Sequence, residues 1–83
     1  MLFLENYVYS HAGTFNCCEG QRVVMGVGNI VSCSQQCDSQ GLGCSTFSFI
    51  DELGLCITYE TITDTISYPG ALSYEKKSSK CGS

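Results

Sequence analysis

Residues 32–59 read SCSQQCDSQGLGCSTFSFIDELGLCITY and hold the helix signal, the strand signals and the cysteine spacing that decide the fold. The first third predicts a short helix between Ser32 and Gly41. Ser32 followed by Gln35 has the form of a capping box, which satisfies two free amide donors at a helix start. Gly41 can adopt the left-handed backbone conformation that ends many helices. We therefore expect a helix of about two to three turns in this segment.

Two cysteines of this helix are expected to attach it to the rest of the fold. Cys33 and Cys37 are four residues apart, which places both sulfur atoms on one side of a helix. The helix has almost no aliphatic residues, so hydrophobic contact alone would not hold it in place. We expect its buried side to be fastened by disulfides.

After the helix, the sequence pattern changes from a helical period to the alternation of a β-strand. Phe47 and Phe49 alternate with small polar residues, as a half-buried strand requires. A hairpin loop with Gly54 at a position of positive φ follows, and Cys56 and Ile57 then fall on opposite faces of the return strand. The threonine-rich segment 61–65 reads as a loop.

Five segments read as strands: residues 3–9, 22–27, 46–50, 55–59 and 71–77. The first two are rich in β-branched or aromatic residues, and Gly26 marks the place where the second one ends or bends. The prediction is an α+β fold, a mostly antiparallel β-sheet of about five strands with one short disulfide-tethered α-helix packed on it.

The length and the cysteine content indicate a small secreted domain. The chain has 83 residues, which is one domain over 1–83, and seven of them are cysteines. Small extracellular domains use disulfides to supplement a small core, whereas cytosolic thiols stay reduced. The apolar run at the N-terminus stops at Glu5, too early for a signal peptide. We therefore expect a module excised from a larger secreted protein; a short cytosolic protein that begins at Met1 is the alternative.

Several motifs together resemble a PAN/apple domain. They are GNIVSC at 28–33 with Cys37, CSTFSF at 44–49, CI at 56–57 and YEKK at 74–77. This family includes the N-terminal modules of plasminogen and hepatocyte growth factor, the apple repeats of plasma prekallikrein and factor XI, and secreted micronemal adhesins of apicomplexan parasites. The resemblance covers residues 6–81, and its middle part is the specific one.

The resemblance implies disulfide pairings that the spacing alone leaves open, because four cysteines allow three pairings. The implied bridges are Cys33–Cys56, Cys37–Cys44, and Cys81 with Cys17 or Cys18. Residues 78–83 are expected to form a flexible tail unless Cys81 is bridged. The odd cysteine total leaves one sulfur unpaired. That sulfur is expected to be buried and inert, or to join another domain or chain. The third possibility is that it lacks its partner because of the place where the fragment was cut.

Composition argues against several classes of function. The net charge is −4, whereas a nucleic-acid-binding protein needs a basic surface. No segment approaches the roughly 18 apolar residues of a membrane span, so no membrane insertion is expected. The single histidine, His11, falls in a polar loop far from the core cysteines, and no Cys-x2-Cys pair occurs, which argues against a metal site and against a Cys–His catalytic pair. We expect no enzyme and no cofactor.

A recognition module is what remains, and the resemblance implies the same. It implies binding of a protein partner or a carbohydrate by one of several domains in a secreted protein. The expected parent is a parasite microneme adhesin; a plasma or growth-factor-like protein that docks a protein partner is the alternative. Few basic residues are present, so a protein partner or a neutral glycan fits better than a heparin-type sugar. A spacer between neighbouring domains is the third possibility.

The candidate ligand-binding residues are Tyr68, Tyr74, Lys76 and Lys77, which the strand prediction places near one sheet edge. An aromatic ring beside polar side chains suits a neutral sugar. Tyr68 precedes the Pro69-Gly70 turn and is expected to be exposed. Tyr74 alternates with Leu72 and is also interpretable as a core residue. The lysines are also interpretable as a solvated strand end.

Overall fold

The computed structural model describes residues 4, 6–16 and 21–77. It is an α+β fold, as the sequence predicts. The strands are β1 (Tyr7–His11), β2 (Gly13–Asn16), β3 (Arg22–Val24), β4 (Thr46–Ile50), β5 (Leu55–Tyr59), β6 (Asp64–Ser67) and β7 (Ala71–Lys76). The helical segments are α1 (Ile30–Ser39) and two single 3-10 turns, η1 (Gly41–Gly43) and η2 (Asp51–Leu53).

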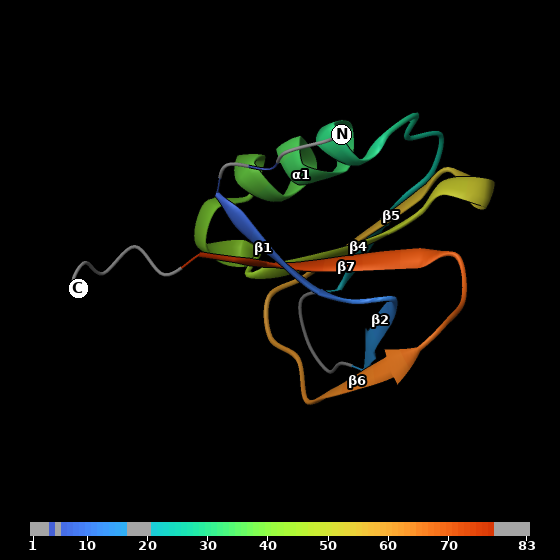
Figure 1. Cartoon of the computed structure of the whole chain (residues 1–83). Coiled ribbons are helices and arrows are strands. Elements are labelled where there is room, and N and C mark those ends of the chain that lie inside the picture. The colour runs from blue at the N-terminus through green and yellow to red at the C-terminus, as the bar shows by residue number, and fades with distance from the viewer. Residues whose placement is uncertain (1–3, 5, 17–20, 78–83) are drawn as a thin grey trace.

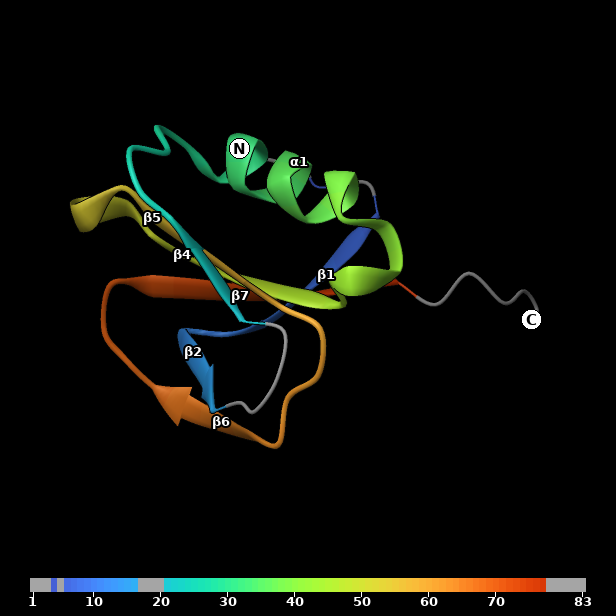
Figure 2. The same cartoon turned by 180° about the vertical axis from the view of Figure 1, so that it is seen from behind.

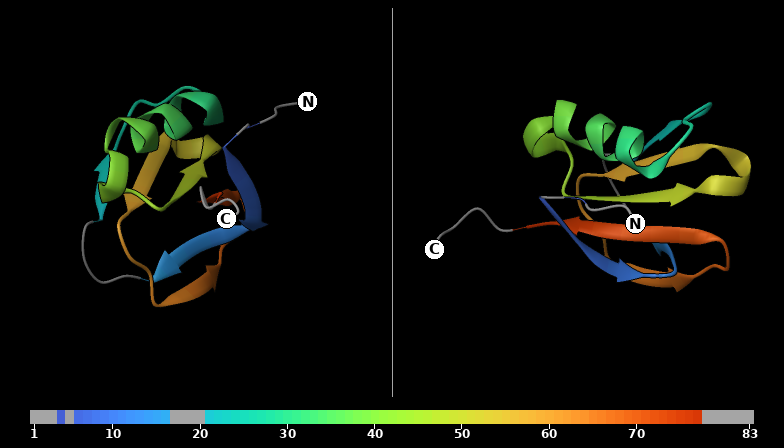
Figure 3. Two further views of the ribbon diagram at one scale, coloured as in Figure 1. Left: turned by 90° about the vertical axis from the view of Figure 1, so that its left-hand side faces the viewer. Right: turned by 45° about the horizontal axis from the view of Figure 1, so that its top comes forward.

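The elements form three layers (Figures 1 and 2). The central layer is a five-stranded antiparallel sheet in the order β1-β7-β4-β5-β3. Helix α1 packs on one face of this sheet, chiefly on β4 and β5. The antiparallel ribbon β2-β6 contacts β4 and β7 through β2 and lies on the side opposite the helix, as the end-on view in Figure 3 shows.

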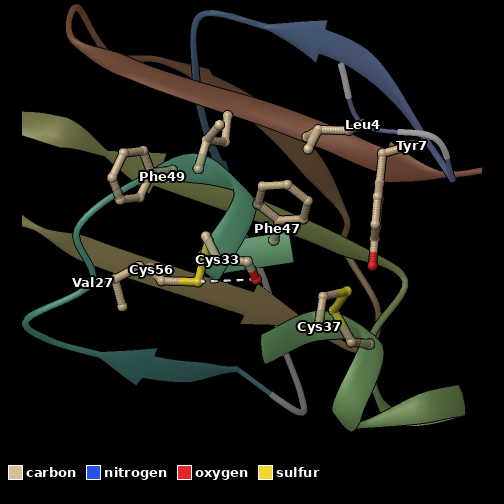
Figure 4. Close-up of a cluster of buried hydrophobic side chains, with 10 residues drawn as sticks. Leu4, Tyr7, Val27, Cys33, Cys37, Phe47, Phe49 and Cys56 are labelled. Carbon is tan, nitrogen blue, oxygen red and sulfur yellow. Dashed lines mark hydrogen bonds between the residues drawn. A yellow bond between two sulfur atoms is a disulfide. The ribbon is translucent and has the colours of Figure 1, made fainter. Parts of the chain in front are cut away.

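Strand β4 is buried along its whole length because both faces are covered. Phe47 and Phe49 point to the helix side, where they join the core with Leu4, Tyr7 and the cysteines (Figure 4). Ser48 points to the other side and faces Ser73 of β7, with 2.6 Å between the hydroxyl oxygens. The Ser73 hydroxyl donates to the carbonyl of Gly13. These two serines allow the ribbon to approach the sheet closely while both of their hydroxyls keep a partner.

The close approach of the ribbon gives a prediction for Gly13. A Cβ added there would lie 1.9 Å from the backbone carbonyl oxygen of Ile66, and a backbone atom cannot rotate away. We expect Gly13→Ala to destabilise the fold by about 1–3 kcal/mol or more, since the two ribbon strands must separate. Thermal unfolding followed by circular dichroism measures the effect.

Gly28→Ala is the matched control, because a Cβ at Gly28 meets no atom within 4 Å and its φ is not positive. That variant should be neutral or slightly more stable. Equal midpoints for the two alanine variants would contradict the close approach of β2 to β6.

The helix begins earlier than predicted, so the capping box at Ser32 is wrong. The N-cap is Asn29, whose Oδ1 accepts a 2.8 Å hydrogen bond from the Ser32 amide. The three extra residues join the helix because Ile30 is then buried in the core, with 3% of its surface exposed. The other end agrees with the prediction: α1 ends at Ser39, and Gly41 has φ 59°.

Two disulfides anchor the helix. Cys33–Cys56 joins α1 to β5 with a Cα–Cα distance of 5.4 Å, and Cys37–Cys44 joins the last turns of α1 to the residue after η1 at 5.3 Å. These are the two pairs that the resemblance implies, and all four cysteines are buried. The expected bridge of Cys81 to Cys17 or Cys18, and the expected tail 78–83, lie outside the described residues.

Several strands differ from prediction. The first strand is shifted to β1 (Tyr7–His11), and the threonine-rich segment is not wholly a loop, because β6 forms in it.

His11 is not in a polar loop, because it is the last residue of β1. Its Nε2 lies 2.9 Å from the carbonyl oxygen of Thr14 and its Nδ1 lies 2.9 Å from the hydroxyl of Ser10. A carbonyl accepts only, so Nε2 carries the proton. Gly54 has positive φ, 63°, as predicted, and β3 ends at Val24, shortly before Gly26.

Candidate functional site

A groove of about 400 Å³ opens between the start of α1 and the helix-side face of β4 and β7. It is lined by Asn29, Ile30, Phe49, Asp51, Leu72 and Tyr74. Most of this lining is apolar, and the two polar residues come from the helix N-cap and from η2. Its size lies within the range of small ligand pockets.

The strand register builds the floor of the groove. Phe49 pairs with Leu72, and Phe47 pairs with Tyr74, so these side chains share the helix-side face. The helix packs chiefly on β4 and β5, which leaves the β7 side of this face less covered. Leu72 consequently has 40% of its surface exposed, although its neighbour Phe49 is buried.

An aromatic row supports the wall that Tyr74 forms. The Tyr74 ring stacks on Phe47, with centroids 5.5 Å apart and an interplanar angle of 13°. Tyr9 meets Tyr74 edge to face at 5.6 Å, and Tyr7 meets Phe47 in the same way at 5.0 Å. Offset and edge-to-face contacts are the favourable geometries for aromatic pairs. The row therefore fixes the orientation of Tyr74.

The polar groups of the groove differ in what they can still bind. The Asn29 Oδ1 atom is used by the Ser32 amide, whereas its Nδ2 makes no hydrogen bond to another described residue. Asp51 is exposed, and within residues 4, 6–16 and 21–77 its carboxylate has no hydrogen-bond or ion-pair partner. The Asp51 carboxylate is thus the strong acceptor that the groove offers to a ligand.

A second, more polar hollow of about 240 Å³ lies beside α1 near Tyr7 and Asp38. The Tyr7 hydroxyl donates to Asp38 Oδ1 at 2.7 Å and to the Ser34 carbonyl at 3.3 Å. Burial of the phenol, followed by the hydrogen bond to Asp38 and its charge, raises the pKa of Tyr7 above its ordinary value. The phenol stays protonated and ties β1 to α1, which is a structural role.

The structure does not bring the four predicted ligand residues together. Tyr74 lines the groove. Lys76 is half-buried, and its Nζ donates to the Gly41 carbonyl at 3.1 Å. Tyr68 is exposed but lies before β7, and Lys77 lies after it. Six strand residues separate these two ends, which is about 20 Å.

The predicted position of these residues near a sheet edge is wrong. Strand β7 is an interior strand with β1 on one side and β4 on the other. The reason is that the N-terminal strand returns to pair with the last one, a contact between distant segments that no local pattern indicates.

Three residues of the groove were not predicted as site residues: Asn29, Asp51 and Leu72. Asn29 carried a usable signal, since asparagine is among the best N-cap residues. Asp51 belonged to a predicted hairpin loop. Leu72 looked like core because it alternates with Tyr74, and its exposure depends on where the helix lies.

Among residues 4, 6–16 and 21–77, no three His, Cys, Asp or Glu side chains are grouped so that they could hold a metal ion. In the same part of the chain, no helix has the length and apolar character needed to cross a membrane. The chain matches no protein-family model and no curated protein. The PAN/apple resemblance therefore stays a prediction from the motifs quoted above.

Proposed function

We propose that this chain is an extracellular recognition module of the PAN/apple type that binds a protein partner and has no catalytic activity. The observation that carries the proposal is the groove at the start of α1, with Leu72 exposed in an apolar lining. The two disulfides fit a secreted or extracellular protein, because such bridges persist in oxidising compartments. The proposed parent is a multidomain adhesin such as a microneme protein.

The groove has the features of a small protein-binding site. Leu72 provides an exposed aliphatic contact, and the half-exposed Tyr9 extends the apolar surface beyond Tyr74. Interfaces obtain most of their affinity from a few anchors that enter such hollows, while a polar rim adds specificity. Asp51 and Asn29 supply that rim.

Neutral carbohydrate is the second candidate, and Tyr74 is the observation that favours it. An aromatic ring beside the Asn29 amide and the Asp51 carboxylate is a set of groups that suits a sugar. One face of the Tyr74 ring is covered by Phe47, however. The apolar lining of Leu72, Phe49 and Ile30 also gives hydroxyl groups no partner. A protein side chain fits this lining better.

Leu72→Ala tests the groove as a binding site. Peptides selected from a displayed random library on the wild-type domain should bind the variant about 30-fold more weakly, the loss typical of a central anchor. The truncation removes the exposed aliphatic contact from the floor of the groove and adds no charge. Fluorescence anisotropy with labelled peptides measures the dissociation constants, and circular dichroism checks that the variant folds.

Val23→Ala is the matched control, because Val23 is also exposed, at 52%, but lies on the other face of the sheet in edge strand β3. It should bind the peptides like the wild type. Equal affinities for the wild type and the Leu72 variant would contradict the groove as the site. If no peptide is selected but the domain gives a glycan-array signal that Leu72→Ala removes, carbohydrate is favoured. If the domain binds neither peptide nor glycan, a spacer is favoured.

A further inference from the structure

We propose that the groove receives a basic side chain, arginine above all, from the partner protein. This inference rests on the proposed function and names the chemistry of the residue that binds. An arginine side chain combines an aliphatic stem with a charged, planar end, and the groove combines an apolar floor with the Asp51 carboxylate at its rim. Such side chains bury their stems along apolar surface while the charged head reaches a polar partner.

The floor of the groove matches the stem. Ile30 and Phe49 are buried, and Leu72 is partly exposed beside them. Three methylene groups that pack on these residues would remove apolar surface from water on both molecules. A neutral polar ligand would gain nothing from this part of the groove.

The rim matches the charge. Asp51 has two carboxylate oxygens without a described partner, which is the acceptor arrangement that a guanidinium fork binds in bidentate fashion. The neighbouring Glu52 is exposed and adds a second negative charge on η2. Among the described residues, no cation lines the groove: Arg22 lies in edge strand β3, and Lys76 is bound to the Gly41 carbonyl.

The partial positive charge at the start of helix α1 repels a cation at this place, so this repulsion must be compared with the attraction by the acidic rim. A helix N-terminus carries roughly half a positive elementary charge, and the first turn of α1 holds no acidic residue. Asp51 and Glu52 together carry two full negative charges. The net charge of the chain, −4, has the same sign. The summed field at the rim therefore attracts a cation.

Three small probes separate the stem from the charge. They are the N-acetyl methylamides of arginine, citrulline and norleucine, which share a stem but differ in charge or in the polar end. Titration of the isotope-labelled domain, followed by amide chemical shifts, should show the largest changes at Asp51, Leu72 and Tyr74 with the arginine probe. The citrulline probe should bind at least about tenfold more weakly, because it lacks the charge.

Variants of the acidic rim complete the test. Asp51→Asn should remove the preference for arginine over citrulline, and Asp51→Glu should keep it. Asp64→Asn is the matched control, since Asp64 is an exposed acid on β6 on the far side of the sheet. Its amide oxygen can still accept from the Thr65 amide, so that variant should bind like the wild type.

Two outcomes would overturn the inference. If norleucine or citrulline shifts the groove residues as strongly as arginine does, the groove binds an uncharged side chain, and the proposed function stands without its basic partner. If no probe shifts these residues up to its solubility limit, the inference also fails. Loss of selected-peptide binding in Leu72→Ala would then still support the proposed function, and unchanged binding in that variant would remove both.

Discussion

Replacement of both Cys33 and Cys56 by alanine is expected to lower the free energy of unfolding by about 2–5 kcal/mol. The bridge spans 23 residues and joins α1 to the central sheet. Chain entropy alone assigns about 3 kcal/mol to a loop of this size. The two sulfur atoms also fill the space between α1 and β5, where both cysteines are completely buried, so the variant loses packing as well. The total free energy of unfolding of a small domain is about 5–15 kcal/mol, so this loss is a large part of it.

Urea denaturation followed by fluorescence or circular dichroism measures this loss, and removal of both Cys37 and Cys44 is the matched comparison. That bridge spans seven residues, so its removal should cost less, about 2.5 kcal/mol or below. A sharp transition near the parent midpoint in the Cys33/Cys56 variant would show that core packing alone holds α1. A larger loss for the shorter bridge would contradict the dependence of stability on loop length.

The sequence was sufficient to predict those helices and strands whose signals are local. The β4-β5 hairpin follows from the alternation of Phe47 and Phe49 and from Gly54, whose φ is 63°. The end of α1 follows from Gly41. The start of the helix was predicted wrongly, because Ser32 matched a capping box. The burial of Ile30, which favours the earlier start, depends on the sheet beneath it.

The ribbon β2-β6 could not be predicted from hydrophobic pattern. All four residues of β6 are exposed, so the strand has no alternation of apolar and polar positions. It forms because its backbone pairs with β2, and β2 is held by the burial of Phe15 against Tyr59, with ring centroids 5.3 Å apart. That contact joins residues 44 positions apart, which a local pattern does not indicate.

Tyr74 is the one residue of the candidate site that the sequence predicted as a ligand-binding residue. Its place in the groove depends on three facts that appear only in the folded chain. Helix α1 leaves the β7 side of the sheet partly uncovered, the register pairs Leu72 with Phe49, and η2 brings Asp51 to the same place. Lys76 was predicted as a ligand residue because of its charge, but its ammonium group is bound to the Gly41 carbonyl.

Phe47→Ala is expected to destabilise the fold by about 3–5 kcal/mol, the usual cost of truncating a buried phenylalanine. Phe47 has 0% of its surface exposed, and its ring contacts both Tyr7 and Tyr74. The cavity left behind would be closed on one side by β4 and on the other by α1. Neither element can move inward, because both are held by disulfide-bonded cysteines or by sheet pairing.

The same substitution should affect the groove before the domain unfolds. Tyr74 loses the ring on which it stacks, so its orientation should become less defined, which near-ultraviolet circular dichroism detects as a weaker aromatic signal. Leu42→Ala is the matched control, because Leu42 is 98% exposed and its truncation should change stability by less than about 0.5 kcal/mol. A loss of stability in Phe47→Ala no greater than that of Leu42→Ala would contradict the position of Phe47 at the centre of the core. An unchanged aromatic signal in Phe47→Ala, measured below its unfolding transition, would instead mean that the β7 register and the edge contact with Tyr9 orient Tyr74 without Phe47.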